Sequence, residues 1–201
     1  YAAPIIALSI ARIALLISIF LPYWHMQLLA PQYPDGLSVT AYLNRLEGDV
    51  REIDSLNHYI GMRPLGDAAK LERSLSIAGL IALVLLVEGA TYIHTKWAAL
   101  LAVPAIGFPV FFLADLYYWL NNFGQNLDPT AAMSSSVKPF TPPLLGTGMI
   151  GQFETHASMG LGLKLAFVTS VLTIIGLYLH RRAYKPLVEA ARSGRRGEPA
   201  T

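Results

Sequence analysis

The sequence contains no cysteine, and this absence excludes several kinds of site at once. Disulfides, iron–sulfur clusters, a Cys-x-x-Cys-His haem attachment and thiolate sites for copper or zinc all need cysteine sulfur. Charged residues are also scarce, at 14% of the 201 residues, against about 25% in soluble domains. Because 54% of the residues are hydrophobic, the composition favours lipid as the surroundings of much of the chain.

Motifs of common enzyme chemistry are missing as well. The sequence has no glycine-rich phosphate loop, no His-Glu-x-x-His zinc motif and no Gly-x-Ser-x-Gly elbow, so we predict no catalytic residues. His25 with Met26, and His58 with Met62, combine ligand types that suit copper. Such residues at a membrane surface more often pack and hydrogen-bond, and we therefore expect no metal site.

Four apolar stretches approach the length of about 20 residues that a helix needs to cross the hydrocarbon core. They lie at about residues 4–21, 74–93, 97–120 and 160–180. Four such helices in a chain of this size would leave too little polar surface to cover them in water. The sequence therefore predicts an all-α integral membrane protein of four transmembrane helices, with two long structured extracytoplasmic loops at 22–73 and 121–159.

The distribution of Lys and Arg predicts the orientation, since cytoplasmic segments carry an excess of both. Beyond the fourth stretch the basic residues outnumber the acidic ones by six to two: Arg181, Arg182, Lys185, Arg192, Arg195 and Arg196 against Glu189 and Glu198. Residues 22–73 instead hold five basic and seven acidic side chains. We expect a transmembrane domain at 1–182, a basic cytoplasmic tail at 183–201, the connection His94-Thr95-Lys96 on the cytoplasmic side, and both termini there. The short tail needs no nucleic-acid partner to explain it.

The two long loops contain local signals of structure. Alternating apolar and polar residues at 37–43 predict a short strand. Residues 48–59 have apolar side chains at helical spacing, and Gly61 follows as a plausible cap. The second loop is rich in proline around Phe140, which favours extended backbone. We expect the first loop to fold as a small cap or to pack on a partner.

Each predicted membrane helix carries one ionisable residue: Arg12, Glu88, Asp115 and Lys164. A charge at the centre of such a helix costs at least about 2.5 kcal/mol, so these residues usually face the interior and pair. The depths of Arg12 and Glu88 allow an ion pair. Asp115 and Lys164 could form a second pair, or Lys164 could extend to the membrane surface. The alternative is that Glu88 or Asp115 accepts protons beside a quinol site.

Several strings in the two loops carry a family resemblance. They are LAPQYPDGL at 29–37, LNHYIGM at 56–62, and NLDP at 126–129 followed by PFTPPLLG at 139–146. Together with the number and order of the apolar stretches, they resemble the NosB-type four-helix membrane protein encoded beside clade II (atypical) nitrous oxide reductase. The resemblance spans most of the chain up to Arg182. It implies a place in the bacterial inner membrane with the two long loops in the periplasm.

For function, the resemblance implies a role beside the periplasmic multicopper enzyme that reduces nitrous oxide. We expect this enzyme to be a dimer. We expect a non-catalytic subunit that docks and anchors this reductase and supports its electron supply in denitrification. A menaquinol-oxidising electron-entry subunit and a maturation or copper-delivery factor are the alternatives. Membrane lipids are further expected partners, and no cofactor is expected apart from a bound quinone or lipid. The loop residues expected to dock the partner are Trp24, His25, Tyr33, Pro34, Asn57, His58, Tyr59, Met62, Asn126, Asp128, Phe140 and Pro142.

Overall fold

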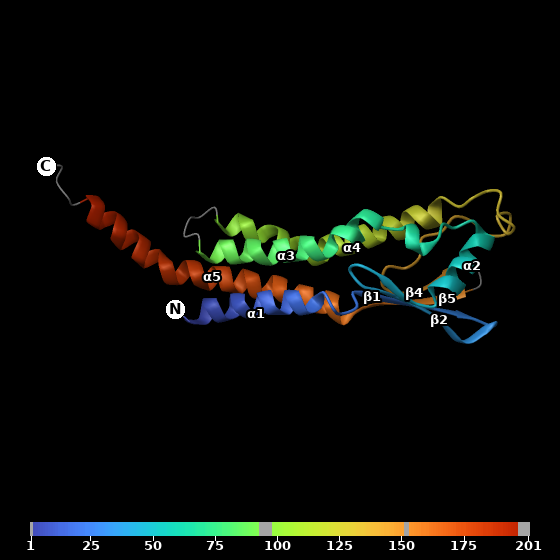
Figure 1. The fold of residues 1–201 in the computed structure, drawn as a ribbon, viewed down its shortest axis with the longest axis horizontal. Helices are drawn as coiled ribbons and strands as arrows, with labels where there is room; N and C mark the ends of the chain where they lie inside the picture. The colour runs from blue at the N-terminus through green and yellow to red at the C-terminus, as the bar shows by residue number, and fades with distance from the viewer. Residues whose placement is uncertain (1, 93–97, 151–152, 197–201) are drawn as a thin grey trace.

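Four long helices lie side by side along the molecule, and an antiparallel sheet occupies one end (Figure 1). The computed structural model describes residues 2–92, 98–150 and 153–196. The helices are α1 (Ala2–Ser18), α2 (Val50–Ile60), α3 (Lys70–Tyr92), α4 (Val103–Gln125) and α5 (Leu161–Arg196), with short 3-10 turns η1 (Leu65–Asp67) and η2 (Ala98–Ala102). The strands are β1 (Trp24–Ala30), β2 (Tyr33–Ala41), β3 (Leu46–Gly48), β4 (Gly146–Ile150) and β5 (Phe153–Met159).

The predicted all-α fold class is wrong. The chain is a mixed α/β protein, 59% helical and 18% strand, with a five-stranded antiparallel sheet in the order β3-β2-β1-β5-β4. The two predicted loops, 22–73 and 121–159, supply the strands of this sheet. The local sequence patterns predict only the strand at 37–43. Most of the sheet depends on pairing between distant segments, such as β1 with β5, where Trp24 lies opposite Met159.

Within the described residues, three helices rather than the predicted four are long and apolar enough to cross a membrane by length and composition. They are Lys70–Tyr92, Ala99–Gln125 and Leu161–Arg182, while Ala3–Ser18 is a shorter apolar helix. Each of the four predicted stretches is mostly helical in its described part, but α1 ends at Ser18, before the predicted residue 21, and α5 continues beyond its predicted end at residue 180 to Arg196. The predicted connection His94-Thr95-Lys96 and the last residues of the tail, 197–201, lie outside the described residues.

Small and hydroxyl side chains bring the long helices together. Gly176 of α5 lets α1 approach closely, since a Cβ there would lie 2.6 Å from Leu8 Cγ. The Thr169 hydroxyl of α5 donates to the carbonyl of Ala11 in α1 at 3.2 Å. Ser170 donates in the same way to the α4 backbone, at 2.9 Å. These contacts are typical of helices that associate in lipid, where the hydrophobic effect does not hold apolar helices together.

Alternate residues of the central strand are buried, and α2 covers one side of the sheet (Figure 1). Trp24, Met26 and Leu28 of β1 are all buried, as the period of two along a strand requires. Leu28 packs in one cluster with Ile53 of α2, whereas Trp24 and Met26 pack in another cluster with residues of α4. The predicted amphipathic helix and its cap are confirmed, because α2 ends at Gly61 in the left-handed region, with φ of 81°. The predicted strand at 37–43 falls largely within β2.

Tyr23 lies where the helices meet the sheet, and it is fully buried. Its hydroxyl is 2.8 Å from Ser18 Oγ, and its ring centroid is 4.9 Å from that of Phe112. Burial raises the pKa of Tyr23 to about 12. The Gly160 NH donates to the Tyr23 carbonyl at 2.9 Å, and a Cβ on Gly160 would lie 2.1 Å from the Pro22 oxygen. The start of α5 is thus fixed against the end of α1.

Candidate functional site

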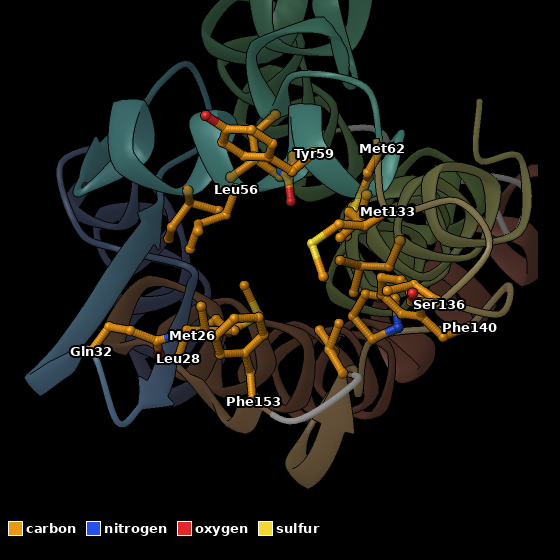
Figure 2. A pocket seen from close by; sticks show the side chains of 18 residues that line it. Met26, Leu28, Gln32, Leu56, Tyr59, Met62, Met133, Ser136, Phe140 and Phe153 are labelled. Atoms are coloured by element: carbon orange, nitrogen blue, oxygen red, sulfur yellow. The ribbon is translucent and has the colours of Figure 1, made fainter. Parts of the chain in front are cut away.

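A cavity of about 470 Å³ opens at the sheet-containing end, between the sheet, α2 and the α4–β4 loop, residues 126–145 (Figure 2). Its lining is mostly apolar and includes Met26, Met62 and Met133, which come from three different segments and surround the hollow in Figure 2. The volume lies within the range of about 300–1,000 Å³ typical of ligand sites. It is also large enough to admit an apolar side chain of a partner protein.

Backbone hydrogen bonds between α2 and the α4–β4 loop hold one wall of this cavity. The Asp128 NH donates to the Gly61 carbonyl at 2.8 Å, and the Met133 NH donates to the Tyr59 carbonyl at 2.9 Å. The Thr130 NH and hydroxyl both donate to the Asp128 carboxylate, which holds the pKa of that carboxyl below its usual value. The strings LNHYIGM and NLDP, which are distant in the sequence, therefore meet at this wall.

The proline-rich part of the same loop packs on the end of α4 and on β1. The Phe140 NH donates to the Gly124 carbonyl at 3.0 Å, and a Cβ on Gly124 would lie 2.1 Å from the Phe140 oxygen. The Trp24 indole donates to the Leu144 carbonyl at 2.7 Å. Residues 137–143 have neither helix nor strand, as their prolines predict. Their backbone is nevertheless fixed by these contacts rather than free.

Asn57 is the most deeply buried polar group at the cavity. It lines the hollow, is 7% exposed, and its Nδ2 has no hydrogen-bond partner among the described residues. A buried donor without a partner costs about 1–3 kcal/mol. A ligand or partner group that brings an acceptor oxygen to Asn57 would recover that hydrogen bond, so this end of the cavity favours an apolar group that carries a carbonyl or hydroxyl.

The residues predicted to dock a partner lie in different environments. Those that line the cavity are Asn57, Tyr59, Met62, Phe140 and Pro142. Those exposed elsewhere on the same end are Pro34, His58, Asn126 and Asp128. Tyr33 and His25 are half-buried. Trp24 is only 3% exposed and its indole NH is already bonded within the chain, so it is a core residue rather than a docking one.

The histidines and methionines considered for copper do not form one ligand set. Met26 and Met62 line the cavity, whereas their neighbours His25 and His58 do not. His25 Nδ1 is 3.0 Å from the Thr40 hydroxyl, and the His58 ring packs against Tyr59. Among the described residues, no three side chains of His, Cys, Asp or Glu come together where they could hold a metal ion.

The ion pair predicted between Arg12 and Glu88 is present and joins α1 to α3. The Arg12 side chain is 16% exposed, and its Nη2 also donates to the Ser9 hydroxyl at 2.9 Å. A charge within a membrane helix needs such partners, because lipid supplies none. The geometry fits a structural role in which the pair fixes α1 against α3.

The second predicted pair does not form in the described part of the chain, where no ion pair joins Asp115 to Lys164. Lys164 is exposed near the start of α5, from where its long side chain can reach a polar surface. Asp115 instead lines a cleft between α3 and α4, together with Glu72. The two residues therefore have separate surroundings.

Comparisons with protein-family models, with curated proteins and with solved structures find no match for this chain. The candidate site therefore depends on geometry alone. Sequence reasoning missed several cavity residues, among them Met133, Ser136 and Phe153. Met133 and Ser136 lie in an irregular loop with no periodic pattern to reveal them. Phe153 begins a stretch of alternating apolar and polar residues, which was the available signal for strand β5.

Proposed function

We propose that this chain is a membrane-anchored accessory subunit that docks a periplasmic nitrous oxide reductase and holds it at the bacterial inner membrane, close to its electron supply. The observation that carries the proposal is the architecture: helices of membrane-spanning length end in a folded domain with an open apolar cavity. The choice of partner follows from the resemblance of the loop strings to NosB-type proteins. A docking role of this kind requires no catalytic residue in the chain.

The surface of the long helices supports the membrane part of this proposal. Ile13 of α1, Leu85 of α3, Phe111 of α4 and Val171 of α5 are each more than half exposed. Contiguous apolar surface of this kind is rarely left in water and marks membrane or protein contacts. With the basic tail in the cytoplasm, both termini are cytoplasmic and the sheet-containing end lies in the periplasm.

The mouth of the cavity is the proposed docking surface. Tyr59 and Met133 line it and remain 55% and 43% exposed. A partner side chain inserted between them would bury both, and Asn57 would gain an acceptor if that side chain carried an oxygen. Interfaces obtain most of their affinity from a few such anchors in desolvated pockets.

Co-purification of the reductase after mild detergent extraction tests the proposal. Met133→Glu places a charge in the proposed docking surface, and we expect at least about a tenfold loss of captured reductase. Met149→Glu is the matched control, because Met149 is also exposed at this end (63%) but lies outside the cavity lining. Equal capture by both variants would contradict docking at the cavity. No capture by the unmodified chain, even after crosslinking, would contradict the partner.

A further inference from the structure

A second hollow, of about 700 Å³, extends between α3 and α4 from Val103, the first residue of α4, towards the sheet-containing end. Figure 1 shows these two helices side by side. The polar side chains of this cleft gather at the end nearest the sheet: Glu72 and Arg73 in the first turn of α3, and Asp115 and Trp119 late in α4. The remaining lining is apolar. The cleft is therefore amphipathic along its length.

Apolar residues at the side of the cleft remain exposed. Leu75, Val103 and Phe111 line the hollow, and each is more than half exposed. If α3 and α4 lie in the membrane, these residues face lipid acyl chains. A molecule that enters from this side must then have an apolar tail and a more polar head, which would lie beside Arg73 and Asp115.

The polar end of the cleft has hydrogen-bond donors that are not used. Arg73 Nε is buried without a partner, although the other end of its guanidinium donates to the Gly66 carbonyl. The Trp119 indole NH lies near Asp115 but outside hydrogen-bond geometry. The head of a ligand thus meets two donors without a partner, on Arg73 and Trp119, beside the carboxylates of Asp115 and Glu72.

The two donors and the two carboxylates together discriminate between lipid-soluble molecules by the charge and hydrogen bonding of the head group. A phosphate head would satisfy the donors, but it is an anion and would be repelled by both carboxylates. A neutral head group with an oxygen at each of two opposite positions can accept a hydrogen bond from Arg73 or Trp119. When these oxygens are hydroxyls, the head group can also donate a hydrogen bond to Asp115. The aromatic walls at Phe108 and Phe112 favour a planar ring, which stacks on such side chains.

We propose that the cleft between α3 and α4 binds the ring of a lipid-soluble quinone or its quinol, with Arg73 and Trp119 as donors to a ring oxygen and Asp115 as acceptor from a ring hydroxyl. The proposal is for binding alone. It depends on the membrane position of α3 and α4 and not on the docking of a reductase, so the two proposals fail independently.

Equilibrium binding of decyl-benzoquinone to the purified full chain tests this site, with quenching of tryptophan fluorescence as the signal. Gly107→Leu fills the cleft from α4, where a Cβ meets nothing within 4 Å. Ala78→Leu is the matched control, since Ala78 is exposed on α3 but does not line the cleft. We expect saturable quenching that weakens at least tenfold in Gly107→Leu and is unchanged in Ala78→Leu. Gly79→Leu, which fills the cleft from α3, replaces Gly107→Leu if that variant does not fold.

Two further measurements test the chemistry of the head. Asp115→Asn should weaken binding of the reduced quinol more than binding of the quinone, because only the quinol donates to this residue. Phosphatidylglycerol, which has the same apolar character but an anionic head, should fail to displace the probe. Quenching that does not saturate, equal binding by the filled variant and the Ala78 control, or displacement by phosphatidylglycerol as strong as by unlabelled quinone would each overturn the proposal.

Discussion

Between the long helices, the polar contacts are isolated ones, the Arg12–Glu88 ion pair and the Thr169 and Ser170 bonds to neighbouring backbones among them. At the sheet-containing end, a network of backbone hydrogen bonds joins α2, the α4–β4 loop and the strands. A helix satisfies its own backbone and can present apolar side chains to lipid. An irregular loop cannot, so its NH and C=O groups need partners or water. This difference is what the proposed position requires, with the helices in lipid and the sheet-containing end in water.

The largest expected effect is at the junction of these two regions. Gly160→Ala would place a Cβ 2.1 Å from the Pro22 carbonyl oxygen, a backbone atom that cannot move without separating α5 from α1. We expect a loss of about 3 kcal/mol in the free energy of unfolding, measured by thermal or denaturant unfolding of the detergent-solubilised protein. Gly79→Ala, where a Cβ meets nothing within 4 Å, should leave stability unchanged or slightly raised. Equal unfolding curves for the two variants would remove the close approach from this account.

A smaller effect is expected within the helical region. Glu88→Gln leaves the Arg12 guanidinium without its ion-pair partner, and we expect a loss of about 2–3 kcal/mol because an unpaired charge is costly in lipid. The double variant Arg12→Leu, Glu88→Leu removes both charges and should recover most of the loss. A double-mutant cycle on unfolding free energies checks this, and strictly additive effects would argue against coupling between the two residues.

At the junction itself, the Tyr23 hydroxyl should contribute less. Tyr23→Phe removes the bond to Ser18, while Ser18 keeps its bond to the Leu15 carbonyl, so we expect a loss of about 1 kcal/mol. Because burial raises the pKa of Tyr23 to about 12, the folded state keeps the neutral phenol longer than the unfolded state does. Stability should therefore fall as the pH rises from about 10 towards 12, and this part of the decline should be absent from Tyr23→Phe.

The smallest effect is expected at the exposed wall of the cavity. The pKa of Asp128 is lowered by the two hydrogen bonds from Thr130, so its stabilising contribution is complete above about pH 3.9 and is lost as the pH falls through the lower folded value. Hydrogen exchange of the Thr130 amide should become faster in that acidic window. In Asp128→Asn, which keeps an acceptor oxygen without the charge, the same amide should show no such step.

The sequence predicts the helical region far better than the sheet-containing end, for a physical reason. A membrane-length helix is a local property, visible as an apolar run. Depth along the helices predicts the Arg12–Glu88 pair correctly, but it also allows an Asp115–Lys164 pair that is not found among the described residues. α2 and its Gly61 cap are equally local. The strands depend on partners distant in the sequence, such as Trp24 with Met159.

The cavity shows the same limit at the level of single residues. Asn57, Tyr59 and Met62 belong to the string LNHYIGM, which carries the family resemblance. Their convergence with Met133 and Phe153 depends on how the α4–β4 loop folds back on α2. Nor does spacing reveal that Asp115 lies near Glu72 rather than Lys164. That arrangement requires the packing of α3 against α4 to be known.

Cysteine labelling in intact cells tests the central claim, that the helices cross a membrane and place the sheet-containing end in the periplasm. The native chain has no cysteine, so single probes are free of background: Ser135→Cys, exposed on the α4–β4 loop, Val171→Cys on the apolar face of α5, and Ser193→Cys in the basic tail. A membrane-impermeant maleimide should label Ser135→Cys in cells with a permeabilised outer membrane, Ser193→Cys only after lysis, and Val171→Cys in neither case. Labelling of Ser193→Cys before lysis with protection of Ser135→Cys, or ready labelling of Val171→Cys, would contradict the claim.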